Sequence, residues 1–289
     1  MSGSSIGERV VGRIVVGVDG SPSSERALRW AAQQARMTGQ ELHAVMSWNV
    51  PVPHDEPLTG EFDWGGDAAG ALMKTVENVL GEPDARQVVP HVTQGHPAKV
   101  LMDAARNADL LVVGSRGHGG FASLLLGSVS QHVIAQATCP VVVVHEHRTA
   151  TGRIVVGVDG SPESERALRW AAGQARLTGG ELHAVLVGHR PATGDVEPLK
   201  RPDWPDESQI LAATVIAALR GEDSSGIVQE VLDGHPAAAL LRAAEDADLL
   251  VVGWRGRGGF SGMLLGSVSR QVAAHAPCPV VVHHQVPVS

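Results

Sequence analysis

The sequence has little of what several protein classes require. It contains two cysteines, Cys139 and Cys278, which do not make a disulfide framework. Each stands before a proline at the start of a valine run, and this position favours a small buried hydrophobe over a redox pair. No apolar run approaches the roughly 18 residues that span a bilayer, and the first residues lack the pattern of a secretion signal. We therefore expect a cytoplasmic protein without a membrane anchor.

Positive charge is also scarce. Lysine and arginine total 23 against 31 acidic residues, which gives a formal net charge of -8. No general attraction to nucleic acid or to an anionic membrane follows from this balance. The three lysines, Lys74, Lys99 and Lys200, lie outside the glycine-rich loops, so the sequence has no P-loop. Efficient phosphoryl transfer is not expected, and at most a weak ATPase is left open.

Internal repetition is what the sequence has in abundance. The stretch "GRIVVGVDGSPSSERALRWAA" from Gly12 returns from Gly152 with a single difference, Ser23 against Glu163. The stretches "ELHAV", "GHPA" and "ADLLVVG" also occur twice. The repeat is much longer than the roughly 20 to 50 residues of a solenoid unit. The sequence therefore predicts two tandem domains, residues 1–148 and 149–289.

Within each copy the apolar pattern alternates between strand and helix. "RIVVGV" from Arg13 is a β-branched run that suits a strand covered on both faces. Ser21 and Pro22 form a helix start, and alanines at helical spacing follow until Gly39. Further strands are predicted at 41–48, 85–94, 109–115 and 140–146, and further helices at 71–80, 97–107 and 128–137. The predicted fold class is α/β, with two tandem doubly wound domains that each have a parallel sheet and helices on both faces.

A glycine-rich loop follows the fourth predicted strand of each copy. Its pattern is G-x-x-G, nine residues, then G-S, formed by Gly114, Gly117, Gly127 and Ser128 and repeated by Gly253, Gly256, Gly266 and Ser267. Glycine admits positive φ and lets a ligand approach backbone amides. The helix that begins at Ser128 offers free N–H groups and a positive dipole end. The loop can therefore cradle a polyphosphate, although glycines here can also serve loop geometry alone.

At these residues the chain resembles the universal stress protein family, specifically its ATP-binding branch in the tandem two-domain form. The resemblance covers nearly all of both repeats. It implies a five-stranded parallel sheet in the order 3-2-1-4-5 in each domain. It also implies that the last strands of the two domains pair, which gives a pseudo-twofold unit that associates again into a homodimer of two-domain chains.

The same resemblance implies a site for ATP with Mg²⁺ in each domain. Asp19 and Asp159 would lie beside the ribose and the metal, and Val45 and Val185 would offer backbone contacts to adenine. The ribose and phosphates would be held by Gly114, Gly117, Gly127 and Ser128, and by Gly253, Gly256, Gly266 and Ser267. Asp19 can also cap the turn that follows it, and the two roles are compatible.

These residues point to an ATP-binding universal stress protein, a nucleotide-responsive regulator of stress adaptation with little or no catalysis. Two alternatives stay open. One is a slow ATPase or nucleotidyl-transferring enzyme on the same fold. The other is an assembly module that binds no nucleotide.

Several conspicuous residues have no firm role at this level. His96 and His235 are expected to be structural or exposed, not ligands. His283 and His284 are adjacent in a strand and point to opposite faces, so they do not form a metal cage. Arg116 and Arg255 are either phosphate partners or solvated loop residues.

The two copies also differ. Trp254 replaces Ser115 of the first copy and is expected to pack in a core or interface more than to stack on a ligand. The stretches 49–70 and 188–208 are the least alike parts and are expected to be flexible loops, with Trp64 and Trp204 as anchors.

Overall fold

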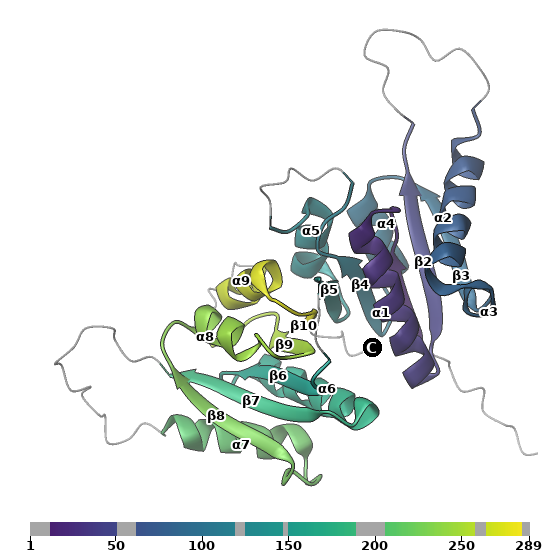
Figure 1. Ribbon diagram of the computed structural model, residues 1–289. Helices are drawn as coiled ribbons and strands as arrows, with labels where there is room; N and C mark the ends of the chain where they lie inside the picture. The colour runs from purple at the N-terminus through teal and green to yellow at the C-terminus, as the bar shows by residue number, and fades with distance from the viewer. Residues whose placement is uncertain are drawn as a thin grey trace, which may run out of the picture.

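The two copies fold into one continuous sheet with helices on both faces (Figure 1). The computed structural model describes residues 12–50, 62–118, 125–146, 150–188, 206–257 and 264–284. The strands are β1 (Arg13–Gly17), β2 (Glu41–Trp48), β3 (Val88–Gln94), β4 (Leu110–Gly114), β5 (Val141–Val144), β6 (Arg153–Val158), β7 (Glu181–Gly188), β8 (Ile227–Asp233), β9 (Leu249–Gly253) and β10 (Val280–His283). The helices are α1 (Pro22–Thr38), α2 (Trp64–Leu80), α3 (Glu82–Ala85), α4 (Pro97–Ala104), α5 (Ser128–Gln136), α6 (Pro162–Thr178), α7 (Glu207–Leu219), α8 (Pro236–Ala243) and α9 (Ser267–His275).

The strand order confirms the predicted fold class. The order across the sheet is β3-β2-β1-β4-β5-β10-β9-β6-β7-β8, so each half has the order 3-2-1-4-5 with parallel neighbours. The two halves meet at β5 and β10, which pair antiparallel with Val141 opposite Val282. The pairing of the last strands, expected from the family resemblance, is therefore present.

The local signals explain why the first helix of each copy starts and stops where it does. The Ser21 hydroxyl accepts a hydrogen bond from the Ser24 amide, and Pro22 occupies the first turn. Gly39 ends the helix with a left-handed φ of 70°. Four of the eight buried residues of α1 are alanines, and such small side chains let this helix lie close against the sheet.

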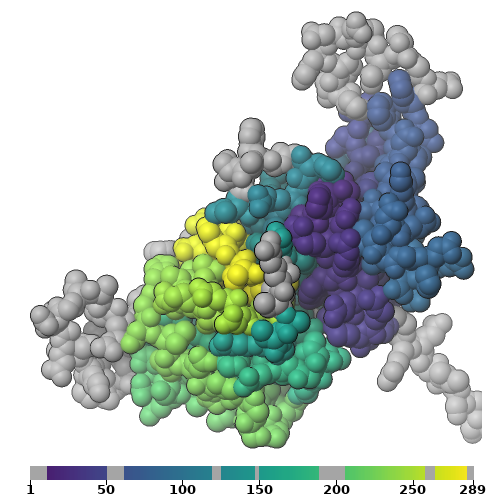
Figure 2. All heavy atoms as spheres, viewed as in Figure 1, coloured from purple at the N-terminus to yellow at the C-terminus, as the bar shows by residue number. Residues whose placement is uncertain are grey.

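Two apolar layers cover the sheet, one on each face. The first layer lies under α1, α2, α6 and α7, and the second lies under α4, α5, α8 and α9. Each layer contains residues of both repeats, such as Val142 and Val281 in the first and Val143 and Val280 in the second. The two halves therefore share their core across the β5–β10 seam, and Figure 2 shows their atoms in direct contact.

Polar side chains cross this seam in a pseudo-twofold pattern. The buried amides of Gln34 on α1 and Gln174 on α6 exchange two hydrogen bonds, of 2.8 and 2.9 Å. His145, which follows β5, bonds through Nε2 to the Ala273 carbonyl of α9 at 3.0 Å. These contacts fix how the two halves face each other.

The segment after the second strand differs from the prediction. The helix predicted from residue 71 begins already at Trp64, because Asp63 caps it by accepting from the Gly66 amide. Trp64 stacks on Phe62 with ring centroids 5.1 Å apart. Trp204 lies outside the described residues. None of the helices described is long and apolar enough to cross a membrane.

Removing one partner of the glutamine pair should destabilise the chain. Gln34→Ala leaves the buried Gln174 amide without its partner, which costs about 1 to 3 kcal/mol of unfolding free energy. Urea unfolding measures this loss, with the exposed neighbour Gln33→Ala as the matched control. A double change of both glutamines to leucine should recover part of the loss. Equal stability of Gln34→Ala and Gln33→Ala would contradict the assignment.

Acid should weaken the seam through two buried histidines. Burial, followed by the charges of Arg166 and His284, lowers the pKa of His283 to about 4, and burial lowers the pKa of His284 to about 4. An unfolded chain binds these protons already near pH 6.5, so stability is complete above that pH and is lost as the pH falls towards about 4. The urea midpoint should fall across this window, and His284→Leu should make the fall shallower. A midpoint that does not change with pH there would show that neither ring stays neutral in the folded state.

Candidate functional site

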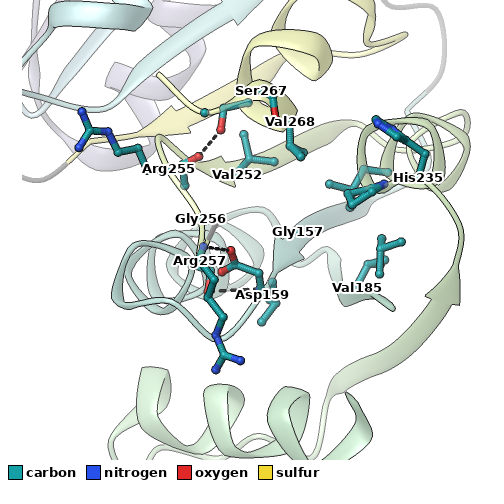
Figure 3. Close-up of a pocket in the computed structure, with 18 residues that line it drawn as sticks. Gly157, Asp159, Val185, His235, Val252, Arg255, Gly256, Arg257, Ser267 and Val268 are labelled. Carbon is teal, nitrogen blue, oxygen red and sulfur yellow. Dashed lines mark hydrogen bonds between the residues drawn. The ribbon is translucent and has the colours of Figure 1, made fainter. Parts of the chain in front are cut away.

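Two matching cavities lie at the carboxyl ends of the strands. One, of about 510 Å³, opens beside β1 and β4, and the other, of about 530 Å³, opens beside β6 and β9 (Figure 3). In open α/β sheets this reversal point of the strand order is where ligands bind. The residues predicted for the first copy all line the first cavity: Asp19, Val45, Gly114, Gly117, Gly127 and Ser128. Their counterparts all line the second: Asp159, Val185, Gly253, Gly256, Gly266 and Ser267.

A carboxylate joins the turn after the first strand to the glycine loop in each copy. Asp19 Oδ1 accepts a hydrogen bond from the Ser21 amide at 3.0 Å, and Oδ2 accepts one from the His118 amide at 3.2 Å. In the second copy Asp159 Oδ2 accepts from the Arg257 amide at 2.8 Å, a bond drawn in Figure 3. The turn-capping role left open by the sequence is therefore present, and the same side chains line the cavities.

The first of these carboxylates is held in its charged form. Burial on its own raises the pKa of Asp19, but hydrogen bonds from Ser21, Ser24 and His118 together outweigh it, and the pKa is lowered. Asp19 is therefore an anion at neutral pH. An anionic oxygen at this position suits a hard cation or a sugar hydroxyl.

The loop glycines serve close packing, not unusual backbone angles. Positive φ, one of the two reasons given for them, is wrong for those that the structure describes, and it occurs instead at Gly20 in the turn after β1, where φ is 80°. A Cβ on Gly114 would lie 2.6 Å from Ser23 Oγ and 2.7 Å from the Ser23 carbonyl carbon. A Cβ on Gly117 would overlap the carboxylate of Asp19. The glycines let the loop lie against the first helix and the aspartate.

The start of the following helix is open to a ligand. Gly127, the N-cap residue of α5, has no side chain to cap the first amides, and its own amide bonds to the Ser115 carbonyl at 2.8 Å. The Ser130 hydroxyl is directed instead to the Gly114 carbonyl at 2.7 Å. Uncapped amides at a helix start favour an anion.

An apolar wall completes each cavity, and the sequence analysis missed it. In the first copy Leu101, Val113 and Val129 line the cavity together with Pro97. Pro97 and Leu101 are four residues apart and lie on one face of α4. The recurrence of "GHPA" was the available signal, because it marks the start of this helix in both copies.

The cationic side chains differ between the copies. Arg116 and His118 line the first cavity, and Arg255 and Arg257 line the second. In Figure 3 the guanidinium of Arg255 is directed away from the space between Asp159 and the apolar wall, and it lies 4.2 Å from the ring centroid of Trp254. The Arg257 guanidinium donates a hydrogen bond to the Gly160 carbonyl at 3.2 Å.

The remaining candidates lie elsewhere or are structural. Trp254 stacks on His284, with ring centroids 5.9 Å apart, and does not line the cavity, which favours its packing role. His235 lines the second cavity, whereas His96 lines a neighbouring groove. Cys139 and Cys278 are free and buried, and burial raises the pKa of each thiol to about 12. Among the described residues no group of three or more His, Cys, Asp or Glu could hold a metal ion.

Known proteins identify the family to which this architecture belongs. A model described as "Universal stress protein family" matches residues 11–145 and 151–284. The chain belongs to the universal stress protein family. A universal stress protein of Mycolicibacterium smegmatis is 35% identical over 284 residues, which are 93% of this chain and 96% of that relative. One from Mycobacterium tuberculosis is 34% identical over 286 residues, 93% and 95% of the two chains.

Solved structures of the family share the fold. A universal stress protein from Archaeoglobus fulgidus superposes with a TM-score of 0.66 at 23% identity and covers 94% of this chain and 98% of its own. The fold of the whole tandem chain is thus shared with this solved structure.

A single methyl group in the glycine loop should detach the loop from the aspartate. In Gly256→Ala the new Cβ overlaps the Asp159 carboxylate, so the bond from the Arg257 amide is lost. A hydrogen bond to a charged group contributes about 1.5 to 3 kcal/mol, so trypsin should cut beside Arg255 and Arg257 roughly tenfold faster or more. Gly173→Ala, where a Cβ meets nothing within 4 Å, is the control. Equal cleavage rates in the two variants would disprove the attachment.

Proposed function

We propose that this universal stress protein binds one ATP with Mg²⁺ in each cavity and acts as a nucleotide-responsive regulator with little or no catalysis. The observation that carries the proposal is the convergence of all the predicted site residues on two matching cavities. Their volumes lie within the roughly 300 to 1,000 Å³ typical of small-molecule sites. The division into domains 1–148 and 149–289 and the association of chains into a homodimer belong to the same proposal.

The two ends of each cavity suit the two ends of a nucleotide. The apolar wall around Val45, Leu101 and Val113 suits a base, and the Val45 backbone is the proposed adenine contact. The uncapped start of α5 at Gly127 and Ser128 suits the phosphates. A nucleotide would thus lie along the cavity with its ribose beside Asp19.

The residues present also fit a magnesium ion that arrives with the phosphates. Mg²⁺ prefers oxygen ligands and commonly takes one carboxylate together with phosphate oxygens and waters. Asp19 is ionised, and each of its oxygens uses one hydrogen bond to the backbone, which leaves further lone pairs for a cation. Asp159 would hold the same position in the second copy.

The lining of the first cavity supports binding without fast hydrolysis. Arg116 is among the described residues that line it, but no lysine is, although a P-loop would place one at the helix start. Several backbone hydrogen bonds to a charged phosphate, each of about 1.5 to 3 kcal/mol, suffice for the roughly 8 kcal/mol of a micromolar complex.

A charge placed at the helix start tests the proposal. Ser128→Asp with Ser267→Asp should leave the helices intact, since an acidic residue at an N-terminus is favourable there, but should repel the phosphates. Calorimetry with ATP and Mg²⁺ should give micromolar binding to two sites in the unmodified chain and at least about a hundredfold weaker binding in the double variant.

The matched control replaces the same two serines by alanine. It should keep most of the affinity, because the backbone and not the hydroxyl holds the phosphate. No heat with the unmodified chain at about 1 mM nucleotide would overturn the proposal. ADP that accumulates in the same samples over hours would indicate a slow ATPase.

A further inference from the structure

The first half contains a second, separate hollow whose polar side chains are mainly basic. This groove has a volume of about 330 Å³ and lies between α4 and the strands β1, β2 and β3. It adjoins the first nucleotide cavity through Val45, which lines both. Its basic side chains are Arg13, His43, His91, His96 and Lys99.

In the second half a carboxylate lies beside the equivalent basic side chains. There Glu230 of β8 occupies the position of His91, as the parallel registers of the outer strands show. Its Oε1 lies 2.6 Å from His183 Nδ1 and 3.5 Å from the Arg153 guanidinium. One carboxylate therefore contacts both a histidine ring and an arginine in the second half.

The first half has the equivalent arginine and histidine, but it has His91 where the second half has the Glu230 carboxylate. Arg13 and His43 are the counterparts of Arg153 and His183. Arg13 Nε and its counterpart Arg153 Nε are both buried without a hydrogen-bond partner, so this atom does not distinguish the two halves. The difference lies at the terminal nitrogens, where Arg153 pairs with Glu230. Among the described residues no carboxylate pairs with the Arg13 guanidinium, so the first half lacks this negative partner.

In the first half two histidines face each other, where the second half has a histidine and a glutamate. His43 Nδ1 and His91 Nε2 are 2.8 Å apart, and the rings stack with their centroids 5.0 Å apart. The other nitrogen of His43 lies 3.1 Å from Glu41 Oε2. One proton satisfies the contact between the two rings, whereas two protons would place donor against donor. Both nitrogens of His43 are thus engaged, and Nδ1 of His91 is the ring nitrogen left to donate to an anion.

We propose that this groove binds a small anion with phosphate or carboxylate groups beside Arg13 and His91, which gives Arg13 the negative partner that Glu230 gives Arg153 in the second half. Arg13, His43 and His91 form the centre of the site. Lys99 stands at the rim, where Asp103 already pairs with it at 2.6 Å, and it adds general attraction more than a fixed contact.

Protonation of His91 gives the site a pH dependence of known sign. Burial, followed by the charges of His43 and Arg13, lowers the pKa of His91 in the empty groove. A bound anion raises that pKa, so binding takes up a proton and strengthens as the pH falls. The other charged groups that face the pair are Glu41 on β2 and Lys99 with Asp103 on α4.

Proton NMR of the histidine rings tests the site directly in the full chain. Inorganic phosphate and succinate serve as probes in separate titrations up to about 10 mM, at about pH 6 and about pH 8. The ring signals of His43 and His91, assigned from His43→Gln and His91→Gln, should shift with either anion. The dissociation constant of succinate, which is mainly the dianion at both pH values, should be at least about threefold lower at the lower pH. Shifts with phosphate alone would assign the site to phosphate chemistry, and shifts with both to phosphate and carboxylate anions in general.

The matched variant copies the second half. His91→Glu supplies the internal carboxylate that Glu230 provides there, so it should fold normally and lose anion binding in the groove at least about tenfold. Failure of the nucleotide proposal would not affect this result, because ligands in the nucleotide cavity are reported by His118 and not by His43 or His91. Unshifted His43 and His91 signals in the unmodified chain, or equal binding by His91→Glu, would overturn the inference.

Discussion

The backbone ladder between β5 and β10 is the interaction on which the rest of the structure depends. Both strands are short, fully buried valine runs, and their N–H and C=O groups need partners once water is excluded. An unpaired β5 would leave an apolar sheet edge exposed in each half. Antiparallel pairing satisfies both edges at once, merges the two cores and brings Gln34 against Gln174.

The repeat keeps the backbone of the site and varies the side chains around it. Both cavities have an aspartate tied to a glycine loop, an uncapped helix start and an apolar wall. Two of the differences change the chemistry of ionisable side chains: His118 becomes Arg257, and His91 becomes Glu230. A shared frame therefore carries two sites of different electrostatics, and the arginine that begins the first strand of each half pairs with a carboxylate on the outer strand only in the second half.

Much of the fold and the site could be predicted because the relevant signals are local. The β-branched runs, the Ser21 cap and the Gly39 stop each act within a few residues, so the element order was predictable. The glycine spacing identified residues that do line the cavities. The reason for the glycines was partly wrong, since a close contact such as that between Gly114 and Ser23 joins residues far apart in the sequence. The start of α2 was missed because its cap, Asp63, follows a stretch without helical pattern.

By itself the sequence determined the tandem duplication, the alternation of strand and helix and the positions of the glycine loops, since these depend on periodicity and on neighbours along the chain. Tertiary structure alone decided which side chains face one another. The hydrogen bond from the His118 amide to Asp19 and the contact between His43 and His91 each join separate strands and loops. The pairing of Arg153 with Glu230, which has no counterpart at Arg13 among the described residues, also joins two strands. Such pairings depend on strand register and helix position, which no local pattern specifies.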